Sequence, residues 1–189
     1  LSLRRQRQMC IRDRAKSQGE VFFPSDLETP AATPRRYQFN QPFGLPVRYH
    51  DIKVFSEVSN LDLVEIHLSY KDLEVDLNQV LPVRQNIGLV IHAPELFAGD
   101  HTLDLCTEDS SYRNHSIAEL QRVIDISRDL RNRFQCSDPV LLVTNVGGFS
   151  EHHHLNRSER KPLRERLITS LKKINTAGEV EIIPQTMPP

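Results

Sequence analysis

The strongest constraint on the fold is an alternation, from about residue 45 onward, between short apolar runs and longer stretches of helical period. Most of the apolar runs are rich in Val, Ile and Leu and too continuously apolar for a sheet with one wetted face. Such runs are typical of parallel strands buried on both sides. The five predicted strands are Leu45–Tyr49, Leu61–Ser69, Asn86–His92, Pro139–Val146 and Glu179–Thr186.

Helical patterns fill the connections between these runs. Ser116 and Glu119 have the spacing of an N-cap and its capping box, and the apolar stripe that follows extends to Phe134. A second helix is predicted from about Ser158 to Ile174, with Pro162 tolerated in its first turn. Shorter helical pieces are predicted over 52–58 and 73–83.

The resulting order of elements, βαβαβαβαβ, predicts an α/β fold in which right-handed crossovers join parallel strands. A doubly wound sheet and a TIM-type barrel both fit this order. No Gly-rich phosphate turn follows the first strand, where a dinucleotide-binding fold has one. We therefore expect a partial TIM-type (β/α)8 barrel containing strands one to five only. The chain ends at 187–189 with no closing helix, so we expect a fragment of a longer protein.

The segments before the barrel differ from it in composition. Residues 1–14 carry five Arg and one Asp and resemble translated sequencing-adapter read-through; the alternative is a disordered basic arm. Residues 15–29 form a short segment with its own apolar run, and 30–45 are Pro-rich and predict a linker. The barrel half is predicted to occupy 46–189.

Composition disfavours several classes of function. The 24 basic and 25 acidic side chains nearly balance, which argues against a general nucleic-acid or membrane surface. The sequence has no apolar run long enough to span a bilayer and no secretory h-region after its basic start. Its three cysteines match no zinc or disulfide spacing, so a reduced, cytoplasmic context is expected.

Polar side chains gather where the predicted strands end, which is where β/α barrels carry their sites. Glu65 and His67 share one face of their strand, opposite an aliphatic face that suits the helix layer, so we expect both to point into the barrel lumen. One interpretation is a structural pair between Glu65 and a basic neighbour such as Arg48; the other is a contact with substrate or metal. The full set of candidates is Arg48, Glu65, His67, His92, Glu95, Asn145 and Gln185.

Other polar features support less specific hypotheses. Asn145 precedes Gly147 and Gly148, which indicates a close backbone approach, either to a ligand or within a tight turn. The three consecutive histidines 152–154 are interpreted as a solvated loop. Asp100, His101, Asp104 and Asp109 lie in a loop that could cover the barrel mouth, with a spacing that matches no specific metal site.

Four strings together resemble a known family: LVEIHLSYKDL (63–73), IHAPELFAGD (91–100), NVGGFS (145–150) and EIIPQTMPP (181–189). They are similar to the sugar-phosphate isomerase/epimerase-like barrel of the xylose-isomerase-like superfamily. More narrowly, they resemble the version fused behind some bacterial sialic-acid (nonulosonic acid) synthases. The upstream string GEVFFPSDL resembles the end of the antifreeze-like domain of such synthases, which would assign it to 15–29.

The resemblance implies a parent enzyme of nonulosonic acid biosynthesis, with an upstream synthase domain as partner and a small sugar or sugar phosphate as ligand. It also implies a divalent metal, Zn or Mn, with His92 as a ligand. Gln185 and Asn145 depart from this pattern, because they stand where a carboxylate and a histidine are common. A neutral amide binds these metals poorly.

Two hypotheses follow. In the first, Glu65 or His67 exchanges a proton alpha to a sugar carbonyl while His92 polarises the oxygen, and Arg48, Glu95, Asn145 and Gln185 bind the substrate. In the second, the domain is a catalytically inactive sugar-binding or assembly module of the same synthase. A DNA-repair nuclease is disfavoured, because residues 15–189 carry net negative charge.

Overall fold

A computed structural model describes residues 37–136, 138–150 and 154–185, all within the unit formed by residues 36–189. The predicted segments 1–14 and 15–29, and the first part of the predicted linker, lie outside the described residues. So do Thr186, two of the three consecutive histidines and residues 187–189.

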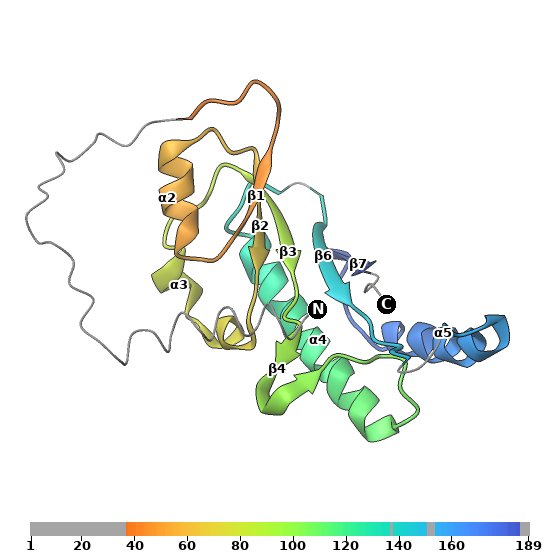
Figure 1. Ribbon diagram of the computed structural model, residues 1–189. Helices are drawn as coiled ribbons and strands as arrows, with labels where there is room; N and C mark the ends of the chain where they lie inside the picture. Colours follow the sequence, from red (N-terminus) through yellow and green to blue (C-terminus); the bar gives the residue numbers. More distant parts are fainter. Residues whose placement is uncertain (1–36, 137, 151–153, 186–189) are drawn as a thin grey trace, which may run out of the picture. The chain divides into compact units, whose positions relative to one another are not determined.

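The five predicted strands are confirmed as one parallel sheet (Figure 1). Its strands follow one another in chain order, β1–β2–β3–β6–β7, with no reversal. Every neighbouring pair is parallel, with His67 opposite His92 and Asn145 opposite Gln185 in register. The strands are β1 (Gly44–Val47), β2 (Leu63–His67), β3 (Gly88–His92), β6 (Val140–Asn145) and β7 (Val180–Gln185).

Helices and short turns occupy the connections. They are α2 (Asp51–Val58), the 3-10 turn η1 (Tyr70–Glu74), α3 (Leu77–Val80), the 3-10 turn η2 (Ala98–Asp100), α4 (Ser110–Arg131) and α5 (Arg157–Leu171). A small antiparallel hairpin, β4 (Leu96–Phe97) and β5 (His101–Thr102), lies between β3 and α4. The molecule is therefore a mixed α/β fold built on a parallel five-stranded sheet.

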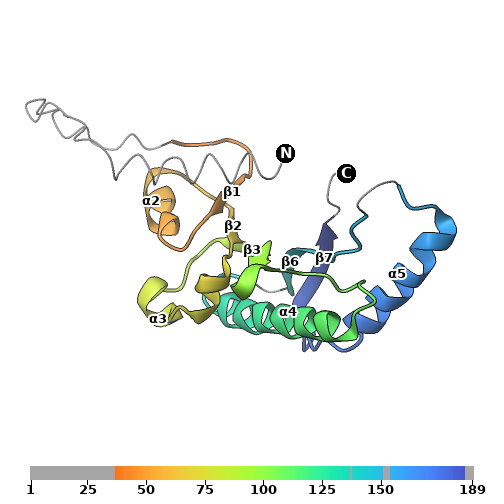
Figure 2. The ribbon, with the colours of Figure 1, turned by 60° about the horizontal axis from the view of Figure 1, so that its bottom comes forward.

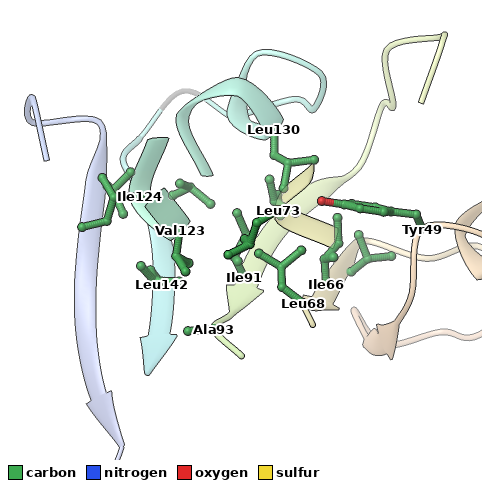
Figure 3. Packing of buried hydrophobic residues seen from close by; sticks show 14 of the residues in the cluster. Tyr49, Ile66, Leu68, Leu73, Ile91, Ala93, Val123, Ile124, Leu130 and Leu142 are labelled. Atoms are coloured by element: carbon green, nitrogen blue, oxygen red, sulfur yellow. The ribbon is translucent and has the colours of Figure 1, made fainter. Parts of the chain in front are cut away.

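The core lies between one face of the sheet and the long helix α4, which runs along that face in Figure 2. Ile66 from β2, Ile91 from β3 and Leu142 from β6 are almost fully buried, and they lie side by side in Figure 3. Val123 and Ile124 of α4 pack on them with no solvent exposure. Truncating one such side chain to alanine costs about 2–5 kcal/mol of stability.

The opposite face of the sheet has no covering helix among the described elements, and we call it the open face. Strand alternation places Leu63, Glu65 and His67 there, because Val64 and Ile66 are buried against the helix layer. Leu63 and Leu141 keep 36% and 39% of their surface exposed. The predicted division of β2 into an aliphatic face toward the helices and a Glu/His face away from them is confirmed.

One predicted helix start is wrong. α4 begins at Ser110, and its N-cap is Asp109, whose Oδ1 accepts from the backbone N–H groups of Ser111 (2.8 Å) and Tyr112 (3.1 Å). Ser116 is instead buried within the helix. An aspartate two turns upstream caps more effectively than a serine whose hydroxyl is engaged elsewhere, because the first N–H groups of the helix need an acceptor.

The predicted start of α5 near Ser158 is confirmed to within one residue, but the place of Pro162 in the helix differs from the prediction. Asn156 caps it, accepting from Ser158 and Glu159, while the Glu159 carboxylate accepts from the Asn156 N–H. Pro162 therefore lies inside the helix rather than in its first turn. Proline lacks an N–H, so the helix continues through it without one backbone bond.

Two glycines follow β6 where another segment of the chain packs closely against the backbone. Gly147 and Gly148 have φ of +82° and +79°. A Cβ on Gly147 would lie 2.5 Å from the Cα of Asp104. The close approach predicted here is made to Asp104, in the loop after β5.

Replacing Gly147 with alanine should destabilise the fold more than the same change at Gly178. Gly178 also has a positive φ (+72°), but its added Cβ meets nothing within 4 Å. Gly178→Ala should cost about 1–2 kcal/mol for its backbone conformation alone. Gly147→Ala should cost about 3 kcal/mol or more, since it adds a steric clash. Urea unfolding measures both, and equal losses would contradict the close packing of the two loops.

Candidate functional site

The candidate site is a row of polar side chains at the carboxyl ends of the strands, on the open face. His67 ends β2, His92 ends β3, and Asn145 and Gln185 end β6 and β7. Arg48 directly follows β1. Five residues far apart in the sequence therefore reach one edge of the sheet, because parallel strands present their carboxyl ends together.

Glu65 and His67 form a direct pair. The His67 Nε2 lies 2.8 Å from Glu65 Oε1, and the side chains keep 40% and 34% of their surface exposed. The pair is made within one strand, between residues two apart on the same face. The hypothesis that Glu65 pairs with Arg48 is wrong.

Arg48 is engaged by a different acidic partner. Its Nη1 donates to the backbone carbonyl of His67 and to Asp72 Oδ2, the latter at 3.3 Å. Asp72 is itself held by Ser69, whose backbone N–H and hydroxyl both donate to its Oδ2. The sequence signal for this carboxylate was the Ser-x-x-Asp spacing at 69–72, which is typical of a helix start. The helical piece predicted over 73–83 begins after Asp72 and so does not include this carboxylate.

His67 and His92 stack on each other. Their ring centroids lie 4.6 Å apart with an interplanar angle of 14°. His92 continues the chain of contacts, because its Nε2 lies 2.9 Å from Gln185 Oε1, across β6, and its Nδ1 lies 3.0 Å from the Ala93 carbonyl. We call the four linked side chains, Glu65, His67, His92 and Gln185, the histidine chain.

Both ring nitrogens of His92 are therefore occupied. A neutral imidazole donates from one nitrogen only, so with Nδ1–H on the Ala93 carbonyl the Nε2 must accept. The Gln185 amide can serve that nitrogen, since rotating it by half a turn presents its NH₂ group instead of its oxygen. The amide of Gln185 can therefore serve His92 either as an acceptor or as a donor.

Burial lowers the pKa of His67 below its ordinary value near 6.5, and the neighbouring charge of His92 lowers it further. Glu65 opposes this shift, while Arg48 adds to it. Neutral His67 is thus favoured in the folded chain. The unfolded chain binds this proton more tightly, so the contribution of His67 to stability is present above about pH 6.5 and lost as the pH falls through the lower folded pKa.

Two other predicted binding residues stand apart from the histidine chain. Asn145 is partly buried, and its Oδ1 has no hydrogen-bond partner among the described residues. Glu95 is exposed in the turn after β3, and no hydrogen bond or ion pair joins it to another described residue. Asn145 therefore has a buried, unpaired acceptor atom at the edge of the site, whereas Glu95 does not converge with the others.

The acidic loop at 100–109 has structural contacts. Asp104 Oδ1 accepts from the backbone N–H groups of Cys106, Thr107 and Gly148 at 2.8–3.1 Å. His101 is buried, with its Nε2 3.0 Å from Ser116 Oγ. These residues fix the loop onto α4 and onto the loop after β6.

The donor set of the site does not fit a divalent metal as arranged. His92 has both nitrogens engaged, and Glu65 is turned toward His67. Gln185 and Asn145 supply amides, which are weak ligands for Zn and Mn. Within the described residues no group of three or more His, Cys, Asp or Glu side chains is placed to hold an ion. Metal binding by His92 stays a prediction that would require displacing Gln185.

Comparison with known proteins adds no family assignment: no protein-family model matches the chain, and no curated protein matches it significantly. In the described part of the chain, none of the helices has both the length and the apolarity to span a membrane.

The pKa of His67 should respond in opposite directions to changes at its two neighbours. Glu65→Gln removes the charge that raises this pKa and leaves a weaker, neutral acceptor, so the pKa should fall further below 6.5. His92→Gln removes a charge that lowers it, so the pKa should rise. NMR titration of the histidine ring protons measures both. A His67 pKa at or above 6.5 in the unaltered chain would contradict the arrangement described.

Proposed function

We propose that residues 46–189 are part of a TIM-type (β/α)8 barrel, of the sugar-phosphate isomerase/epimerase-like kind found behind nonulosonic acid synthases. The unbroken strand order supports the barrel, because doubly wound sheets reverse their order at a switch point. Right-handed crossovers in one direction place every connecting helix on the same side. The open face then corresponds to the barrel interior, where the histidine chain is the candidate active site.

The proposed chemistry is proton exchange at the carbon next to a sugar carbonyl. His67 donates from Nε2 to Glu65, which leaves Nδ1 without a hydrogen bond among the described residues. That atom would take the proton from carbon, giving an enediolate, and return it to the same or the neighbouring carbon. Glu65 would stabilise the imidazolium formed, and His92 would polarise the carbonyl oxygen through Nε2–H once Gln185 is displaced and that nitrogen has taken a proton from water.

The observation that carries this proposal is the Glu65–His67 pair stacked on His92. A base that works near neutral pH must be mostly unprotonated yet able to accept a proton. The lowered pKa of His67 meets the first condition, and the Glu65 carboxylate at 2.8 Å meets the second. Arg48, with 43% of its side chain exposed, is available beside this pair for an anionic group such as a sugar phosphate.

A second candidate function is a catalytically inactive sugar-binding or assembly module of the same synthase. The amides of Asn145 and Gln185 favour it, because amides bind sugar hydroxyls without transferring protons. Gln185 also holds His92 by the nitrogen that would otherwise face a substrate. In both cases the proposed partners are a small sugar and an upstream synthase domain, in the cytoplasm, with no role for nucleic acid or membrane.

Substituting Glu65 separates the two functions in the complete protein. In the enzyme, Glu65→Gln should lower turnover of the sugar by roughly 10²–10⁴-fold while changing its binding little, because the amide keeps the shape but cannot compensate a charged imidazole. The measurement is exchange of the sugar's alpha hydrogen with deuterated water, followed by NMR. The matched control is Glu181→Gln. Glu181 is an exposed glutamate near the amino end of β7, far along the strand from Gln185.

Equal exchange rates in the Glu65→Gln and unaltered proteins would exclude Glu65 from catalysis. Sugar binding without any exchange in the unaltered protein would favour the binding module.

A further inference from the structure

A hollow is lined by side chains that run from β5 to the first turn of α4 and by Phe149, in the loop after β6. It has a volume of about 500 Å³, within the range of small-ligand sites. We call it the mouth hollow, and its lining residues are Thr102, Asp104, Thr107, Asp109, Tyr112 and Phe149. The proposed reaction uses none of these residues.

The aromatic wall of the mouth hollow is held rigidly. The Tyr112 hydroxyl donates to the Thr102 carbonyl at 2.7 Å and accepts from the Thr102 N–H at 3.2 Å. Its ring rests on buried His101, with ring centroids 4.3 Å apart. His101 is fixed in turn by Ser116, whose hydroxyl oxygen also accepts from the Asp104 N–H at 3.1 Å. Tyr112 therefore presents its ring in one orientation although it lies on the surface.

The polar wall is fixed as well. Asp104 is held through Oδ1 by three backbone N–H groups, and Asp109 is held through Oδ1 by two at the start of α4. Each carboxylate thus keeps its Oδ2 without a described partner. Side chains that are already ordered lose little conformational entropy when a ligand binds. A ligand that makes only weak polar contacts can therefore still bind.

We propose that the mouth hollow binds an uncharged sugar ring. Tyr112 (37% exposed) and Phe149 (51% exposed) offer apolar ring faces for the C–H side of a sugar. Two threonine hydroxyls and two free carboxylate oxygens offer partners for its hydroxyl groups. The carboxylates disfavour a phosphorylated or otherwise anionic ligand in this position.

The charge around the hollow also favours a neutral ligand over a cation. Backbone N–H groups and the N-terminus of α4 compensate much of the negative charge of Asp104 and Asp109. The Arg113 guanidinium donates to the carbonyls of Thr107 and Glu108 close by. The inference extends the proposed function, because the hollow lies at the same edge of the sheet as His92, but binding there requires no catalysis.

NMR titration of the ¹⁵N-labelled chain with methyl glucopyranoside tests the proposal. The amide signals of Thr107, Gly148 and Phe149 should shift together in the unaltered chain. Phe149→Ala should weaken binding roughly fivefold or more, and Phe149→Tyr should restore it, because both rings offer the same face. Phe39→Ala is the matched control, since Phe39 is 47% exposed but lies before β1.

Two further ligands test which class of ligand the mouth hollow prefers, and one variant tests whether binding there is independent of catalysis. Glucose 6-phosphate and tetramethylammonium should both bind less tightly at these amides than the methyl glycoside. Glu65→Gln should leave the titration unchanged, so loss of catalysis and loss of the hollow can be told apart. The proposal is overturned if the glycoside shifts none of these amides, if tetramethylammonium binds more tightly, or if Phe149→Ala binds as well as the unaltered chain.

Discussion

The packing of one face of the parallel sheet against α4 determines where every other functional feature lies. Ile66, Ile91 and Leu142 are buried against this helix, and the two-residue repeat of a strand then directs their neighbours to the opposite face. Moving β2 by one residue would place Glu65 and His67 in an apolar core, where their charge and polarity are costly. The hydrophobic contact thus fixes the register of the sheet, and the register assembles the histidine chain from β2, β3 and β7.

The strands and the two faces of β2 could be predicted from the sequence, because long apolar runs and strict alternation are strong local signals. The start of α4 could not, since its first turns are polar and the apolar stripe begins only at Ile117. The hydrogen-bond and ion-pair partners of the site residues could not be predicted from the sequence either. Glu65 contacts His67 rather than Arg48, and Gln185 reaches His92 across β6, which depends on the curvature and side-chain lean of the whole sheet. The glycine pair after β6 was correctly interpreted as a close approach, but only the fold shows that Asp104 is what it approaches.

The candidate site combines groups that are chemically able to transfer protons with amides that are not. Glu65 and His67 form a pair suited to a base, while Gln185 and Asn145 are amides that keep one charge state at any ordinary pH. Gln185 is central to this balance, because it occupies the nitrogen of His92 that a metal or a substrate would use. If the bound sugar displaces Gln185 and His92 Nε2 takes a proton, His92 would become available to polarise a carbonyl. If Gln185 stays in place, the same surface is a rigid binding platform, and the mouth hollow beside it contributes a second contact with sugar.

The central claim is that a small sugar binds on the open face against the stacked histidines. Histidine modification by diethyl pyrocarbonate, read by mass spectrometry with and without the sugar in the complete protein, tests it most directly. His67 and His92 should react in the free protein and become protected when the sugar is bound. His50, with 81% of its side chain exposed beyond β1, should react equally in both states. Unchanged reactivity of His67 and His92 at saturating sugar would contradict the account.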